Sequence, residues 1–153
     1  MLRMSTKGHH ATRIMMYLAG SPARPVSKVE IGQAETIPPG YLQQIMVRLT
    51  EAGLVRSHRG KMGGFTLARH PGDITILQVL RATEGPFELA PCVDAGVPCD
   101  RSGICPAHLL WTEATVLLND LFERTTVADL IASGHQLQER ERQLLPEPEG
   151  QPS

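Results

Sequence analysis

The sequence predicts a mainly α-helical protein with a small β-wing, built as a winged helix-turn-helix followed by a long dimerisation helix. Three observations predict this fold class. Apolar residues recur at helical intervals over most of the 153 residues. Two short helical segments stand directly before a glycine-rich hairpin sequence. The longest helical segment has an apolar face wider than one small neighbour could cover, which indicates a second copy as its partner.

The first part of the chain contains the expected helix-turn-helix. A first helix over about 6–18 has apolar residues at helical spacing on one face. A short helix over about 27–33 opens with a serine and a glutamate at capping-box spacing. A second short helix over about 38–52 begins with two prolines, which suit a first turn, and stops before a glycine.

A hairpin is expected next, with strands at 54–58 and 65–69. The residues between them are Arg-Gly-Lys-Met-Gly-Gly. Glycines allow the tip to turn and to approach a surface closely, and the two cations suit phosphate or a narrow minor groove. A glycine-rich turn alone is usually only a turn, but directly after a helix-turn-helix it indicates a wing.

The remaining elements are mainly helical. A capped helix is expected over 75–85, the longest helix over about 109–125, and a short helix over 126–134 that a glycine ends. The four regions expected are a winged-helix region (1–85), a cysteine-rich loop (86–108), a dimerisation helix with the short helix (109–134) and a disordered polar tail (135–153). Met46 and Trp111 are expected in the core.

Charge is divided unequally along the chain. Residues 1–72 carry ten basic and three acidic side chains, a net charge of +7, whereas residues 73–153 carry five and thirteen, a net charge of −8. A basic half is typical of a protein with a polyanionic partner, here double-stranded DNA. The alternative is that the charges merely solvate the surface, and the winged-helix pattern argues against it.

The residues predicted to contact DNA lie at the start of the first helix, on the helix-turn-helix and at the wing tip. They are Lys7, Ser27, Pro38, Gly40, Tyr41, Gln43, Gln44, Arg48, Arg59, Gly60 and Lys61. Glutamine can pair bidentately with adenine. The outer face of the second helix could instead be simply solvated, and Arg48 could pair with Glu51.

The three cysteines, Cys92, Cys99 and Cys105, lie in a segment that prolines and glycines interrupt too often for a helix or strand. His108 follows the last of them by three residues. A long loop with four soft ligands indicates a metal cofactor, and thiolates are the ligands that iron–sulfur clusters prefer. Structural zinc more often uses closely spaced cysteine pairs, which this loop lacks. A zinc site, cysteines without a metal role and an ordinary His108 are the alternatives.

The sequence predicts a cytoplasmic protein with no membrane partner. No apolar run approaches the ~18 residues of a membrane span. The first residues lack the continuous apolar block of a signal peptide. In that compartment the thiols are expected to stay reduced.

The sequence resembles the IscR/NsrR group of Rrf-type winged-helix transcriptional regulators over about residues 3–130. The matching segments are Ser5-Thr6-Lys7-Gly8, residues 37–44, Gly53-Leu54-Val55, the wing residues 59–65, the helix segment 73–85 and the three cysteines. The resemblance implies a homodimer whose long helices cross and whose winged helices each bind half of a palindromic operator. It also implies an iron–sulfur cluster on the cysteine loop that switches DNA affinity.

The cysteine spacing, C-x6-C-x5-C, departs from the five-residue gaps of IscR-like members. His108 is similar in position to the IscR histidine that is the fourth ligand of a two-iron cluster. NsrR-like members take an acidic ligand from the first helix of the partner, and the matching position here is about His9. A [2Fe–2S] cluster is therefore favoured, a [4Fe–4S] cluster stays open, and His9 or His10 of the partner subunit are other candidate ligands.

The leading expectation is a dimeric DNA-binding regulator, a repressor, whose cluster senses redox state, nitric oxide or iron–sulfur status. The alternative is a winged-helix regulator with structural zinc or a metal-free thiol-redox loop. No enzyme is expected, because no strong base or oxyanion pattern flanks any cysteine.

Overall fold

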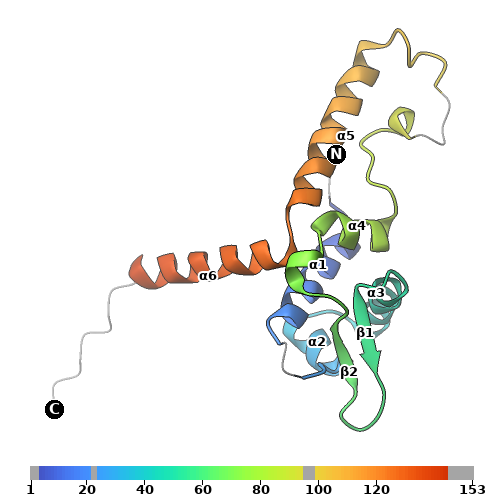
Figure 1. Cartoon of the computed structure of the whole chain (residues 1–153). Helices are drawn as coiled ribbons and strands as arrows, with labels where there is room; N and C mark the ends of the chain where they lie inside the picture. The colour runs from blue at the N-terminus through green and yellow to red at the C-terminus, as the bar shows by residue number, and fades with distance from the viewer. Residues whose placement is uncertain (1–3, 22–23, 95–98, 145–153) are drawn as a thin grey trace.

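The computed structural model describes residues 4–21, 24–94 and 99–144, which form six α-helices, two short 3-10 helices and one hairpin. The elements in order are α1 (Thr6–Ala19), α2 (Lys28–Glu35), α3 (Pro39–Glu51), β1 (Val55–His58), β2 (Gly64–Leu67), η1 (Pro71–Asp73), α4 (Ile76–Glu84), η2 (Pro91–Val93), α5 (Pro106–Arg124) and α6 (Val127–Leu144). The first half forms a body from which α5 and α6 extend in different directions (Figure 1). The expected mainly α-helical winged-helix fold is confirmed.

Hydrogen-bonding side chains start several of these helices. The Ser27 hydroxyl accepts from the Glu30 amide at 3.2 Å at the start of α2. At the start of α4, Thr75 and Gln78 form a reciprocal capping box with two hydrogen bonds of 3.3 Å. Each cap satisfies amides that have no partner within the helix, so these short sequences determine where α2 and α4 begin.

The apolar stripes of α1, α3 and α4 meet in one core. The buried residues of α1 and α3 are Ala11, Ile14, Met15, Leu18, Leu42, Ile45, Met46 and Leu49. Met46 is therefore a core residue, as expected, whereas the prediction for Trp111 is wrong, because 41% of its surface is exposed. Packing one face of α3 into this core turns its opposite face to solvent.

The wing is a two-stranded antiparallel sheet in which Val55 faces Leu67 and His58 faces Gly64. The expected hairpin is present, although its second strand ends before the predicted residue 69. A contact that the sequence did not reveal joins it to the body: the Val26 amide donates to the Phe65 carbonyl at 2.9 Å and the Phe65 amide donates back at 2.8 Å. The wing is thereby fixed to the connection between α1 and α2.

The end of α5 is tied to the body by main-chain hydrogen bonds. The Ile76 amide donates to the Thr125 carbonyl at 2.8 Å, and the Val127 amide donates to the Ile74 carbonyl at 2.9 Å. Thr126 and Asp129 then cap α6 as expected, with the Thr126 amide donating to Asp129 at 2.8 Å.

The prediction that a glycine ends the last helix at Gly134, with a disordered tail after it, is wrong over residues 135–144. Helix α6 continues through Gly134 to Leu144. One glycine costs a helix interior only about 1 kcal/mol, and the glutamine, leucine, glutamate and arginine residues that follow are good helix formers. The rest of the predicted tail, 145–153, lies outside the described residues. Within the described part of the chain, no helix is long and apolar enough to cross a bilayer.

Candidate DNA interface and cysteine segment

Helix α3 presents its polar residues on the outer surface of the body. Gln43, Gln44 and Arg48 are exposed and Tyr41 is half-buried. Pro38 is the residue before the first turn, where no side chain caps the helix, and Gly40 is exposed in open space. The free amides of such a turn suit a phosphate oxygen.

A hollow of about 500 Å³ brings α1 to the exposed face of α3. Lys7 of α1 lines it together with Gln44 and Arg48. The alternative pairing of Arg48 with Glu51 is not formed between these two described residues. The hollow therefore combines two cations and amides with one carboxylate, Glu51, and its cations and amides suit the sugar–phosphate backbone.

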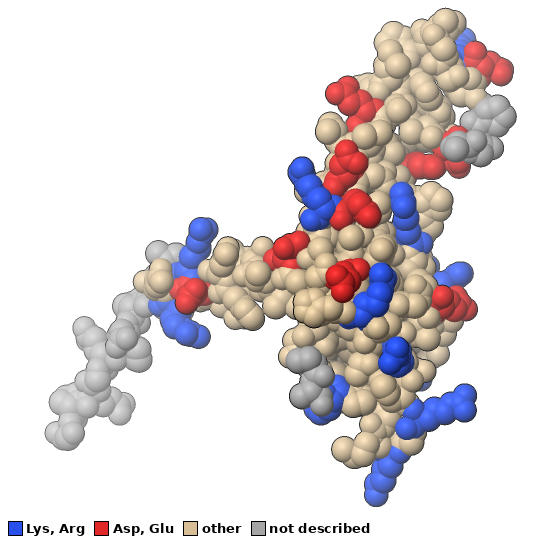
Figure 2. Space-filling model, viewed as in Figure 1, with Lys and Arg blue, Asp and Glu red and all other residues tan. Residues whose placement is uncertain are grey.

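The tip of the wing carries Arg59, Gly60 and Lys61, all exposed. Gly60 has a φ of +104°, which favours glycine. Basic side chains gather over the wing end of the molecule, whereas acidic ones predominate along α5 and the cysteine segment (Figure 2). The charge division along the sequence is thus also a division in space.

Ser27, another predicted contact, is the cap of α2, so its hydroxyl already accepts a hydrogen bond from the Glu30 amide. Its neighbour Lys28 was not among the predicted contacts. The Lys28 ammonium donates to Gln43 Oε1 at 2.7 Å, which links the two helices of the helix-turn-helix. In the sequence, Lys28 could be recognised only as one of the basic residues of the first half of the chain.

Ion pairs set the position of α2 against α1. Arg24 donates to both carboxylate oxygens of Glu30 at 2.9 and 2.7 Å, and the Tyr17 hydroxyl donates to the same carboxylate at 3.3 Å. The hydrogen bonds from Arg24 lower the pKa of Glu30 below its ordinary value. Loss of solvent around Tyr17, with the charge of Glu30, raises the pKa of that phenol.

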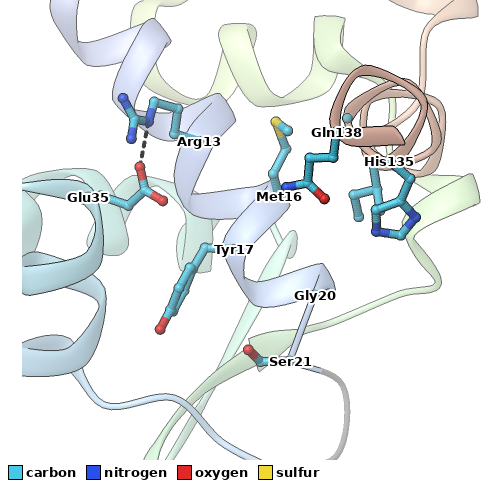
Figure 3. A pocket seen from close by; sticks show the side chains of 10 residues that line it. Arg13, Met16, Tyr17, Gly20, Ser21, Glu35, His135 and Gln138 are labelled. Carbon is cyan, nitrogen blue, oxygen red and sulfur yellow. Dashed lines mark hydrogen bonds and ion pairs between the residues drawn. The ribbon is translucent and has the colours of Figure 1, made fainter. Parts of the chain in front are cut away.

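A second hollow, of about 430 Å³, lies between α1, α2 and α6. The Arg13–Glu35 ion pair, with an N–O distance of 2.5 Å, lies on one side, and His135 and Gln138 of α6 lie on the other (Figure 3). None of the predicted site residues lines this hollow. Its charged groups already neutralise each other.

The cysteine segment ends where α5 begins. Cys105 is the residue before the first turn of α5, and its carbonyl accepts from the His108 amide at 3.1 Å. Cys92, Cys99 and Cys105 are half-buried free thiols, and the buried His108 Nδ1 has no hydrogen-bond partner. Three thiols and an unpartnered imidazole fit an iron–sulfur cluster as a donor set.

The described residues do not, however, gather this donor set. Residues 4–21, 24–94 and 99–144 contain no group of three or more His, Cys, Asp or Glu side chains close enough to hold a metal ion. The four predicted ligands thus belong to one segment but do not converge in the single chain.

Two polar residues that the sequence did not reveal hold the incoming part of this segment against α5. The buried Thr115 hydroxyl accepts from the Leu89 amide at 3.3 Å. The Asn119 amide donates to the Phe87 carbonyl at 3.1 Å, and the Phe87 ring packs edge-on against Phe122. Cys92 and Cys105 are therefore both connected to the same helix.

The other side of α5 is apolar and uncovered. Leu109, Leu110, Trp111, Val116, Leu117 and Leu121 are each at least 41% exposed. A patch of large apolar side chains along one helix is typical of an interface.

Comparison with known proteins identifies the family. The profile of the Rrf2 family, described as iron-dependent transcriptional regulators, matches residues 4–133. The chain belongs to the Rrf2 family. It is therefore a DNA-binding transcriptional regulator, as the predicted resemblance implied.

Individual Rrf2-like proteins are similar over most of their length. Rv1287 of Mycobacterium tuberculosis, provisionally named an HTH-type transcriptional regulator, is 38% identical over 94% of this chain and 88% of its own. The structure of CymR, named the global cysteine regulator of B. subtilis, matches with a TM-score of 0.71 and 32% identity over 87% of this chain and 98% of its own. That of T. potens IscR matches with a TM-score of 0.71 and 28% identity over 96% and 94%.

Proposed function

We propose that this Rrf2-family regulator is a cytoplasmic homodimer that represses transcription from a palindromic operator, and that an iron–sulfur cluster on the cysteine segment switches its DNA affinity. The observation that carries the proposal is the set of donors on one segment: three free thiols and the unpartnered His108 Nδ1. The uncovered apolar face of α5 would pair two subunits, so that one dimer would carry two such sets of ligands.

DNA binding would use the exposed face of α3 and the wing of each subunit. Gln43 and Gln44 are exposed on α3 and would contact base edges, and Arg59, Lys61 and Lys7 would contact phosphates on either side. A dimer that pairs through α5 presents two such surfaces related by a two-fold axis. A palindromic operator has the same symmetry.

The cluster would be held by Cys92, Cys99 and Cys105, with His108 as the fourth ligand, or His9 or His10 of the partner subunit. A two-iron cluster is favoured because His108 is similar in position to the histidine ligand of the two-iron cluster in IscR-like members, and a four-iron cluster stays open. When bound, the cluster would supply a centre that oxidation, nitric oxide or iron loss destroys. The chain's own contribution is structural. Thr115 and Asn119 hydrogen-bond the segment to α5, so a change in the conformation of the segment would be transmitted to that helix.

A second candidate is a metal-free thiol switch, or a structural zinc site, on the same segment. The observation that favours the thiol switch is that the three thiols are free. Oxidation of two thiols to a disulfide would constrain the segment in a comparable way.

Anaerobic purification of the whole protein separates these candidates. We expect a coloured protein that contains iron and sulfide and that binds a palindromic duplex selected from a random pool. Removing the cluster should change that affinity by about 5- to 150-fold, a coupling of about 1–3 kcal/mol. Cys99→Ala should keep the circular dichroism of the wild type and lose the visible absorbance. A colourless protein with zinc, or equal affinity with and without the cluster at matched salt, would refute the cluster proposal.

A further inference from the structure

Gln43 occupies the centre of the exposed surface of the helix-turn-helix. Three separate hollows, of about 640, 500 and 350 Å³, all have Gln43 in their walls. The first lies between α2 and α3, the second reaches Lys7 of α1, and the third reaches Phe65 of the wing. A ligand that occupies any of these hollows would therefore contact Gln43.

Lys28 lies beside Gln43 in two of the three hollows. Its ammonium donates to Gln43 Oε1 at 2.7 Å, and both side chains are exposed. Lys28 is the first residue of α2, whose position is set by the Ser27 cap and by the Arg24–Glu30 ion pair. The start of α2 is thus placed so that the ammonium can reach the amide, and a charged donor makes a stronger hydrogen bond than a neutral one.

This hydrogen bond changes what Gln43 can present to a base. A free glutamine reads adenine by accepting from N6 and donating to N7. With the ammonium on one lone pair of Oε1, the pair still presents the Nε2 hydrogens of Gln43 and the other Nζ hydrogens of Lys28 as donors, against a single remaining lone pair of Oε1 as acceptor, so donors predominate. Guanine is the base that shows two acceptors, O6 and N7, at its major-groove edge.

We propose that Lys28 is a specificity-determining residue, which orients the Gln43 amide so that the pair donates to the O6 and N7 edge of a guanine in each half-site. This inference rests on the proposed binding of operator DNA through α3. It assigns to Lys28 a role in base recognition rather than a phosphate contact.

Selection from a random duplex library, with the whole protein at fixed salt, tests this. The wild type should enrich guanine at one position in each half-site. Lys28→Met keeps the length of the side chain but removes the donors, so it should lose about tenfold in preference for guanine there and gain preference for adenine. Gln43→Ala should remove the preference for either purine. Lys61→Met, at the wing tip, is the control and should weaken binding to all sequences without changing their order.

Two results would overturn the inference while leaving the proposed function intact. Lys28→Met could weaken binding equally for every sequence, as Lys61→Met is expected to do, or it could leave both affinity and base preference unchanged. A wild-type protein that selects no palindromic duplex would overturn the proposed function and this inference together.

Discussion

Gly64 is a residue at which the wing packs closely against the rest of the body. A Cβ atom at this position would lie 2.5 Å from the Val26 carbonyl oxygen and 3.0 Å from the Val26 amide nitrogen. These are main-chain atoms of Val26, which is hydrogen-bonded to Phe65, so they cannot move away as a flexible side chain could. The wing is thus attached through a contact that leaves no room for a methyl group.

Gly64→Ala should therefore lower the free energy of unfolding by about 1–3 kcal/mol, the usual cost of overpacking a filled site. Urea unfolding followed by circular dichroism measures this. Gly134→Ala is the matched control, since its Cβ would meet nothing within 4 Å in α6. That change should raise stability by about 0.5–1 kcal/mol, because alanine favours helix. Equal effects of the two substitutions would contradict the packing at Gly64.

Asp129 makes α6 sensitive to acid. Hydrogen bonds from the Thr126 amide and hydroxyl lower the pKa of this carboxyl below its ordinary value of 3.8. The folded state thus favours the charged form, and the resulting stability is present above the unfolded pKa and lost as pH falls through the folded pKa. Asp129→Asn should lower the melting temperature near neutral pH, and the difference from wild type should shrink on acidification. A difference that grows in acid would contradict this assignment.

Some single-residue contacts could be predicted from the sequence and others could not. The caps at Ser27 and Thr75 join residues only three positions apart, so the pattern contains both partners. The Lys28–Gln43 hydrogen bond joins residues 15 positions apart, and Thr115 reaches Leu89 across 26 positions. Such pairs exist only once the helices have packed, and no spacing rule indicates them.

Among the elements, the wing carries the most direct electrostatic prediction. Arg59→Ala should weaken operator binding and reduce the slope of log affinity against log salt by about one, because one phosphate contact is lost. Fluorescence anisotropy at several salt concentrations measures the slope. Arg124→Ala, at the exposed end of α5, should leave it unaltered. An unchanged slope for Arg59→Ala would place the wing tip away from the phosphates.

The helices show where periodicity is informative about an element and where it is not. The stripes of α1 and α3 predicted their buried faces correctly, because the body supplies the partner for each of them. The apolar pattern of α5 was also visible, yet Trp111 is 41% exposed, since the described part of this chain does not cover it. The length of α6 was underestimated because a glycine was given more weight than the helix formers after it.

At the scale of the whole molecule, the proposed dimer depends on the apolar face of α5. Leu117 is 63% exposed on this helix, and Leu137 is 64% exposed on α6. Leu117→Glu should convert the dimer to a monomer, because a dimer interface would bury the introduced charge without a partner. Leu137→Glu, a matched change outside that face, should remain dimeric. Sedimentation velocity distinguishes the two, and a wild-type protein that sediments as a monomer would refute the interface.

The candidate metal site was predictable as a set of residues but not as an arrangement. Three cysteines and a histidine within one segment indicate the chemistry of the donors, since ligand types are a property of the sequence. The convergence of these donors is not a property of the sequence, because in the described residues no three of them come close enough to hold a metal ion. An arrangement that needs an inorganic centre or a second subunit is not determined by the contacts of one chain alone.

The main-chain hydrogen bonds at Thr125 and Val127 make the foot of α5 a pivot. A helix of this length spans about 28 Å from the pivot to Cys105 at its opposite end. A displacement of about 3 Å at the far end is then an angular change of about 6° between the helix and the body it stands on. In the proposed dimer, where the α5 helices of two subunits pack together, this angular change would alter the distance between the two α3 helices along the DNA duplex.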